Sequence, residues 1–417
     1  MKIRRPALFK DVYRSDAGIG RFLCVMALSG VAVGLYRGIQ DNYLAEIIHI
    51  SPFERGIVEF FREIPGLLVV FILALMYRFT DSRIFKVGVA FMAGGVIGIL
   101  LTSCGLFSMI KVFVVLFMVI FSAGEHIKMP VRAAISMDLA KREKAGASLG
   151  ISNSIIHLGH IIGFIIVMGI FFVLARSGFS RTDLMGYRIV CGISAALMIT
   201  SLLIVLALQE TTLKSKRRRL YFAKKFHKYY MLEVFYGARK QIFLTFAPYV
   251  LILYYNADPA IMSLLYAICA GFGIFCGPLM GKIIDKLGYK IVMVSDTIIL
   301  VLVCLLYGFS HRLFPSGIAF LVVCCNFVLD SIISMASMAS NVYVQRISSS
   351  QEEITATLST GISVNHFFSI FIALLGGWIW KQTGIEVLFS ISAFLGLLNS
   401  AYAATIKKSE ETVKDSL

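Results

Sequence analysis

The sequence predicts an all-α integral membrane protein with twelve transmembrane helices arranged as two six-helix halves. Of the 417 residues, 58% are hydrophobic and 15% are charged, whereas soluble domains carry roughly 25% charged residues. Apolar stretches of about twenty residues, the length that crosses a bilayer, recur along the whole chain. One basic segment near the middle, which contains KSKRRR, separates six of these stretches from the other six.

The twelve spans divide the chain into five regions. We expect an N-terminal segment (1–20), a first half (21–208), a basic linker (209–230), a second half (231–405) and a C-terminal tail (406–417). The first span follows a basic leader and lacks a small-residue cleavage site, so it is not a cleavable signal peptide. The predicted spans are 21–45, 57–77, 85–106, 112–133, 147–174, 185–208, 231–254, 260–281, 290–309, 317–341, 355–378 and 384–405.

The formal charge of +16 is distributed unequally between the two sides of the predicted membrane. Loops on the side of the N-terminus hold 27 of the 40 lysines and arginines, and loops on the other side hold 7. This bias places both termini in the cytoplasm and the protein in the cytoplasmic (inner) membrane. It also makes nucleic acid a poor partner, because the charge follows the membrane topology.

Several classes of chemistry lack support in the sequence. No CxxC or Cys/His spacing suggests a metal site, and no GxxxxGK[ST] loop suggests ATP hydrolysis. No nucleophile–base pair can be assembled from the motifs. We therefore expect no enzyme activity and no cofactor.

A short loop after the eighth span carries a recognisable pattern. GKIIDKLGYK, residues 281–290, resembles the loop signature G-x-x-x-D-(R/K)-x-G-x-(R/K) of the major facilitator superfamily. Its glycines permit a tight turn. The corresponding loop of the first half keeps the aspartate and the bases but lacks both glycines. The predicted gating-loop residues are Asp81, Arg83, Gly281, Asp285, Lys286, Gly288 and Lys290.

The resemblance covers residues 20–405 and implies a substrate site near the membrane midplane. In this superfamily the two halves are related by an axis along the membrane normal. The resemblance implies that spans 1, 4, 7 and 10 line the cavity, flanked by spans 2, 5, 8 and 11. The function it implies is secondary transport by alternating access.

Polar residues form stripes on the same spans. They recur at intervals of three, four or seven residues, which places them on single helical faces. Two arginines in matching spans, Arg37 and Arg239, lie 202 positions apart. The candidate substrate-binding residues are Arg37, Lys128, His157, His160, Arg239, Lys240, Asn341 and His366, and the candidate acids are Asp41, Glu125 and Asp330.

These stripes favour a small polar organic anion as cargo. A guanidinium stays protonated and pairs through two N–H groups with a carboxylate or phosphate. The arrangement is similar to that of the organophosphate/phosphate antiporters within the superfamily. We expect Arg37 and Arg239 to clamp the anion with help from Lys128. The three acids pair with these bases or carry a coupling proton.

Other interpretations stay open at this point. Arg37 with Asp41, and Glu125 with Lys128, can form structural pairs within one helix. A proton-coupled permease for a sugar or nucleoside is the main alternative, ahead of a drug exporter or a transporter-like receptor. The expected partners are a small-molecule substrate, the lipid bilayer, and either a proton or an exchanged anion, for a protein that acts as a monomer.

Overall fold

The computed structural model describes residues 11–14, 17–76, 78–141, 143–208 and 221–406. These residues form helices and no strands; one isolated backbone bridge joins Tyr13 and Ala140. Parts of the predicted N-terminal segment, most of the basic linker and nearly all of the tail lie outside the described residues. The rest of the predicted membrane region is covered.

Ten helical segments are long and apolar enough to cross a membrane. Two of them are composite. The first span continues from α2 (Ala17–Asn42) into a short π-helix (Tyr43–Ile47), and the tenth joins α11 (Ser316–Ile333), a 3-10 turn (Ser334–Ser337) and α12 (Met338–Ile347). The others are α4 (Asp81–Ser103), α5 (Ile110–Asp138), α6 (Ala145–Arg176), α7 (Leu184–Leu206), α9 (Pro259–Leu287), α10 (Tyr289–Leu313), α13 (Gln351–Thr383) and α14 (Ile385–Ala404).

Two more helices complete the predicted twelve. α3 (Pro52–Leu75) and α8 (His227–Tyr255) are as long as the other spans. Neither is among the ten apolar segments, and each carries several charged residues. The all-α, twelve-helix fold expected from the sequence is confirmed, and these two polar helices are the ones that supply most of the buried charge.

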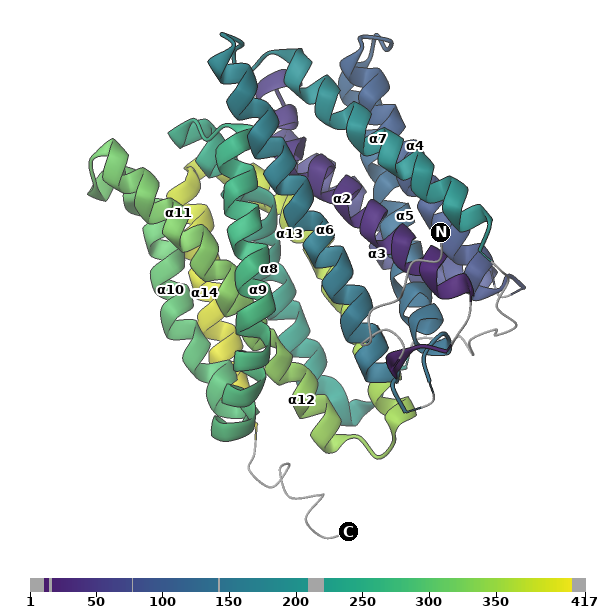
Figure 1. Cartoon of the computed structure of the whole chain (residues 1–417). Coiled ribbons are helices and arrows are strands. Elements are labelled where there is room, and N and C mark those ends of the chain that lie inside the picture. Colours follow the sequence, from purple (N-terminus) through teal and green to yellow (C-terminus); the bar gives the residue numbers. More distant parts are fainter. Residues whose placement is uncertain (1–10, 15–16, 77, 142, 209–220, 407–417) are drawn as a thin grey trace. The chain divides into compact units, whose positions relative to one another are not determined.

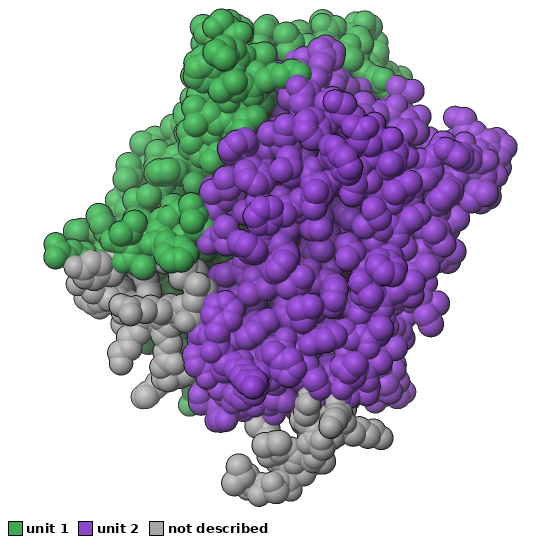
Figure 2. All heavy atoms as spheres, turned by 180° about the vertical axis from the view of Figure 1, so that it is seen from behind, with its two compact units in different colours: residues 1–43, 68–217, 259–267 green, residues 44–67, 218–258, 268–417 purple. Residues whose placement is uncertain are grey.

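The chain forms two compact units, coloured separately in Figure 2. Unit 1 contains residues 1–43, 68–217 and 259–267; unit 2 contains residues 44–67, 218–258 and 268–417. Each unit therefore includes one segment from the other half of the sequence. The first part of α3 packs within unit 2, and the first part of α9 packs within unit 1.

The same packing order is repeated in the two units, whose helices are labelled in Figure 1. In unit 1, α2 packs against α6 and α7, and α4 packs against α5 and α7. In unit 2, α8 packs against α13 and α14, and α10 packs against α11 and α14. Counted as spans, the pairs 1–5, 1–6, 3–4 and 3–6 recur as 7–11, 7–12, 9–10 and 9–12. This correspondence is the structural form of an internal duplication.

Glycines bring α2 and α6 into direct backbone contact in unit 1. A Cβ atom on Gly34 would lie 2.4 Å from the carbonyl oxygen of His160, and one on Gly163 would lie 2.5 Å from that of Val31. Small residues at helix interfaces are a common basis for packing inside membranes, where hydrophobicity does not drive helix association. The close approach fixes the position of His160 beside α2.

The described end of the linker is attached to the start of α13 within unit 2. Lys225 pairs with Glu353 at 2.7 Å, and the Tyr221 hydroxyl donates to the same carboxylate at 2.9 Å. This hydrogen bond raises the pKa of Tyr221, because loss of the phenolic proton would place two anions side by side. The contact holds the chain that enters α8 against α13.

The glycine contact between α2 and α6 predicts a contrast between two substitutions on one helix. We expect Gly163→Leu to destabilise the protein by about 1–3 kcal/mol, because the side chain has no space beside α2. Gly169→Leu is the matched control, since a Cβ there meets nothing within 4 Å. Thermal unfolding in detergent measures the difference; equal melting temperatures for the two variants would contradict the packing described.

Candidate functional site

The first predicted arginine forms an ion pair between two helices of unit 1. Nη2 of Arg37, on α2, lies 2.8 Å and 3.0 Å from the two carboxylate oxygens of Glu125, on α5. The Arg37 side chain is 46% exposed. Asp41 instead accepts a hydrogen bond from the Tyr266 hydroxyl of α9 at 2.8 Å. The structure therefore pairs Arg37 with Glu125 on another helix, and the alternative of an Arg37–Asp41 pair within α2 was wrong.

The second predicted arginine forms the corresponding pair in unit 2. Nη1 of Arg239, on α8, lies 3.0 Å from Oδ1 of Asp330, on α11. Only 5% of the Arg239 side chain is exposed. The two pairs join equivalent helices, span one to span four and span seven to span ten. Their sequence separations, 88 and 91 residues, are also nearly the same. The duplication has preserved the arginine and an acidic partner.

Both guanidinium groups retain donors that no side chain uses. Arg37 engages its carboxylate through Nη2 alone, and Arg239 through Nη1 alone, among the residues that the structure describes. A guanidinium has five N–H groups arranged to match carboxylate or phosphate oxygens. Each pair can therefore accept an additional oxygen-rich ligand without first losing its acidic partner.

Aromatic and cationic groups surround the pair in unit 2. Arg239 and Lys240 both lie over the Tyr236 ring, at 5.4 Å and 5.9 Å from its centroid. The Tyr236 hydroxyl donates to the carbonyl oxygen of Ser334 at 3.3 Å. Ser334 begins the 3-10 turn that follows Asp330. A 3-10 stretch within a long helix often marks a hinge, so the acid of this pair lies next to a deformable part of its helix.

Lys128 is the buried base of unit 1. It lies on the helix of Glu125, is 8% exposed, and donates to the Ser29 hydroxyl at 3.4 Å. No ion pair of Lys128 occurs in the described part of the chain. The proposed Glu125–Lys128 pair within α5 was therefore wrong, because the Glu125 carboxylate is turned toward Arg37. Lys128 remains available to a ligand.

The predicted histidines lie in different surroundings. His157 is exposed and His160 is half-buried on α6, with ring centroids 5.9 Å apart. His366, on α13, contacts a carboxylate: its Nδ1 lies 2.7 Å from Oε2 of Glu63. Asn341 is exposed on α12. None of these positions by itself identifies a substrate contact, so the roles expected for them stay predictions.

A charge network on α3 was not predicted from the sequence. Arg55, Glu59 and Glu63 are all buried. Arg55 donates to Glu59 at 2.8 Å, and Arg62 bridges Glu59 and Glu63. Gln241 of α8 donates to Glu59 at 3.0 Å. The spacing of three and four residues between these charges indicated that they share one face of the helix. Their partners on α8 and α13 lie far away in the sequence and could not be inferred from it.

Glu233 is a further buried acid of α8 that was overlooked. Its carboxylate accepts hydrogen bonds from the Ser340 hydroxyl and the Asn365 amide, both at 3.2 Å. With Glu233 included, the deep acids Asp41, Glu125, Asp330 and Glu233 equal the deep bases in number. These four acids and the four bases Arg37, Lys128, Arg239 and Lys240 together carry no net formal charge.

The second half of the chain matches a family model described as the Major Facilitator Superfamily, over residues 229–416. The fold is similar to solved transporters along nearly its full length. A D-xylose-proton symporter matches with a TM-score of 0.74 at 14% identity, over 95% of this chain and 99% of that chain. The family model covers a little less than half of the chain, and the solved transporters share its fold over nearly the full length.

Two further solved transporters show the same likeness. The nucleoside transporter NupG matches with a TM-score of 0.69 at 14% identity, covering 94% of this chain and 100% of that one. A peptide transporter POT in complex with sulfate matches with a TM-score of 0.68 at 13% identity, covering 98% and 99%. A comparison with curated protein sequences finds no significant match. These findings show that the chain has the fold of solved membrane transporters.

The superfamily loop signature adopts the turn that its glycines suggested. Gly288 has φ +86° and precedes α10, so it occupies a conformation that favours glycine. Lys290 donates to the Ile406 carbonyl oxygen at 2.6 Å, whereas Asp285 and Lys286 are exposed. In the first half, Asp81 is buried at the start of α4, which Thr80 caps. Arg83 is exposed there.

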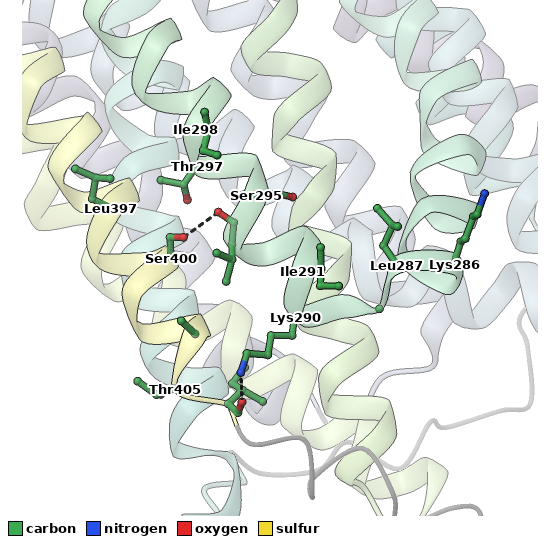
Figure 3. Close-up of a pocket in the computed structure, with 14 residues that line it drawn as sticks. Lys286, Leu287, Lys290, Ile291, Ser295, Thr297, Ile298, Leu397, Ser400 and Thr405 are labelled. Carbon is green, nitrogen blue, oxygen red and sulfur yellow. Dashed lines mark hydrogen bonds between the residues drawn. The ribbon is translucent and has the colours of Figure 1, made fainter.

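A surface cavity of about 1290 Å³ lies beside this loop in unit 2 (Figure 3). Lys286 and Lys290 line it together with apolar side chains such as Ile291, Ile298 and Leu397. None of the predicted substrate-binding residues lines it, so we do not assign the cargo to this cavity.

The different burial of the two arginine pairs predicts different energetic consequences. We expect Asp330→Ala to destabilise the protein by about 3–5 kcal/mol, because Arg239 would be left buried without its anion. Replacing both Asp330 and Arg239 should lower the free energy of unfolding by less than the sum of the two single substitutions. Glu125→Ala should cost under about 1 kcal/mol, because Arg37 is nearly half exposed. The free energy of unfolding of each single and double variant would reveal whether the two pairs contribute differently to stability.

Proposed function

We propose that this protein is a secondary transporter that moves a small polar organic anion, of the organic phosphate or carboxylate class, by alternating access. The observation that supports the proposal is the repeated arginine–carboxylate pair. Each half supplies a guanidinium with unused N–H donors, held by an acid on an equivalent helix. Carboxylate and phosphate oxygens match these donors better than hydroxyl groups do.

In the proposed mechanism, both arginines bind the anion during the transport cycle. Before binding, Glu125 and Asp330 neutralise the two guanidinium groups, which would otherwise be costly within the membrane. The substrate then supplies oxygens to the N–H groups that the acids leave unused. Lys128 adds a positive charge in unit 1, and Lys240 adds one in unit 2.

Substituting the arginines tests their role as anion ligands. We expect Arg37→Lys and Arg239→Lys to reduce uptake by about tenfold to a hundredfold, because lysine keeps the charge but loses the two-pronged contact. Proteoliposome uptake can be measured with glycerol phosphate, hexose phosphate and a dicarboxylate. Arg176→Lys is the control, since Arg176 lies over the Phe172 ring at the end of α6. Unchanged uptake in both site variants would overturn the proposed role.

A neutral polar solute is the second candidate. It is favoured by the equal numbers of deep acids and bases, which leave no net positive charge to attract an anion. Two of the solved transporters with this fold carry xylose with a proton or carry nucleosides.

The two candidates differ in which ligands stabilise the folded protein. An anion transporter should show a higher melting temperature with organic phosphates or carboxylates and no shift with xylose or uridine. Asp330→Asn removes the negative charge beside Arg239 and should strengthen the anion's effect. A shift with xylose or uridine alone would instead establish the neutral-solute alternative.

A further inference from the structure

A crevice between α10 and α14 of unit 2 is unused by the proposed anion contacts. It is the cavity of about 1290 Å³ shown in Figure 3, and the two helices pack against each other beside it. Its lining residues recur at intervals of three, four or seven, which places them on one face of each helix. They are Ile291, Val294 and Ile298 on α10, and Leu397, Ser400 and Ala404 on α14. The crevice therefore follows the line along which α10 and α14 meet.

The depth of this crevice matches one leaflet of a bilayer. α10 begins at Tyr289, and the stretch from Lys290 to Ile298 rises by about 12 Å along the helix axis. Half of a hydrocarbon core of about 30 Å is about 15 Å. Deeper along the same helices, a Cβ on Gly396 would lie 2.5 Å from Cδ2 of Leu300, and neither residue lines the cavity. The crevice therefore runs from the ends of the helices inward by about one acyl chain's share of the membrane.

Exposed apolar side chains form most of the wall. Ile291 is 55% exposed, Ile298 is 77% exposed and Leu397 is 51% exposed. The Ser400 hydroxyl donates to the carbonyl oxygen of Val294 at 2.9 Å, so this polar side chain is satisfied within the protein. The volume also exceeds the roughly 300–1,000 Å³ of small-molecule pockets. Size and polarity both favour a long hydrocarbon chain over a compact polar ligand.

Two lysines line the crevice where the helices end. Lys286 is the next-to-last residue of α9 and is exposed, and Lys290 is the second residue of α10. Lys290 donates to the Ile406 carbonyl oxygen at 2.6 Å, which uses one of the three N–H groups of its ammonium. No aspartate or glutamate lines the cavity in the part of the chain that the structure describes. The lining therefore carries two formal positive charges, which complement an anionic headgroup.

We propose that this crevice binds one anionic phospholipid. Its phosphate binds to Lys286 and Lys290, and an acyl chain lies along the apolar wall. Basic pockets between transmembrane helices bind the headgroups of anionic lipids in this way. The charge distribution of the sequence predicts this end of the helices on the cytoplasmic side, where the leaflet has a negative surface potential. The lipid joins the loop between α9 and α10 to the end of α14, and its binding does not depend on the cargo.

Native mass spectrometry of the delipidated full chain, titrated with single lipids, tests the site. We expect phosphatidylglycerol to bind at least about fivefold more tightly than phosphatidylcholine, since each lysine near an anionic headgroup contributes about fivefold in affinity. Lys290→Gln should weaken phosphatidylglycerol binding about fivefold, and Lys286→Gln combined with Lys290→Gln about twentyfold to thirtyfold. Lys290→Arg should bind like the unmodified protein, because arginine keeps the charge. Equal affinities for the two lipids, or unchanged phosphatidylglycerol binding in the double variant, would overturn the site.

Lys282→Gln is the matched control for charge. Lys282 is exposed one turn before Lys286 on α9 and does not line the cavity, so this variant should keep the unmodified affinity. A loss as large as that of Lys290→Gln would show diffuse attraction to the surface and would count against a defined site.

Ala404→Trp tests the crevice with both lysines in place. The indole should fill the space beside α10 and weaken phosphatidylglycerol binding, and this variant decides the matter if the double lysine variant does not fold. Inorganic phosphate should not displace the lipid, because it makes no contact with the apolar wall. Undiminished lipid binding in Ala404→Trp, or displacement of the lipid by phosphate, would show that the apolar crevice does not hold a phospholipid.

Discussion

The pairing of arginine with a carboxylate on an equivalent helix is the interaction on which the interior of this membrane protein depends. A guanidinium cannot release its proton, so a helix that carries one through the membrane needs an anion nearby. Both units meet this need in the same way, through Arg37 with Glu125 and Arg239 with Asp330. The pairs fix which faces of the first and fourth spans of each half turn toward one another. They also lower the free-energy cost of placing both arginine charges within the membrane.

The twelve helices could be predicted from the sequence because each must satisfy its own backbone and match the bilayer thickness, which are local requirements. The ion-pair partners could not. Spacing within one helix suggested Asp41 for Arg37 and Lys128 for Glu125, since residues three or four apart share a face. The duplication itself offered a better guide: Glu125 and Asp330 follow their arginines by 88 and 91 residues. Reading the two halves together would have identified both pairs.

The network on α3 was hidden for a different reason. The span itself was predicted, but the sequence does not show that Arg55, Glu59 and Glu63 are buried. Their burial depends on Gln241 and His366, which follow Glu59 and Glu63 by 182 and 303 residues. Tertiary contacts over such distances carry no local pattern. Only the packing of the first part of α3 within unit 2 reveals that these charges are enclosed.

Paired charges also suit a protein that must release what it binds. An unpaired buried arginine would bind an anion tightly. Release of that anion would cost much free energy, because it would leave an uncompensated charge in the membrane. An arginine already bonded to an acid loses less when the ligand departs, since Glu125 or Asp330 remains in place. The same logic applies to α3, where two acids and two arginines form a neutral cluster. The proposed transport cycle therefore needs only exchanges between nearly equivalent partners, and none of its steps separates a bare charge from its counterion.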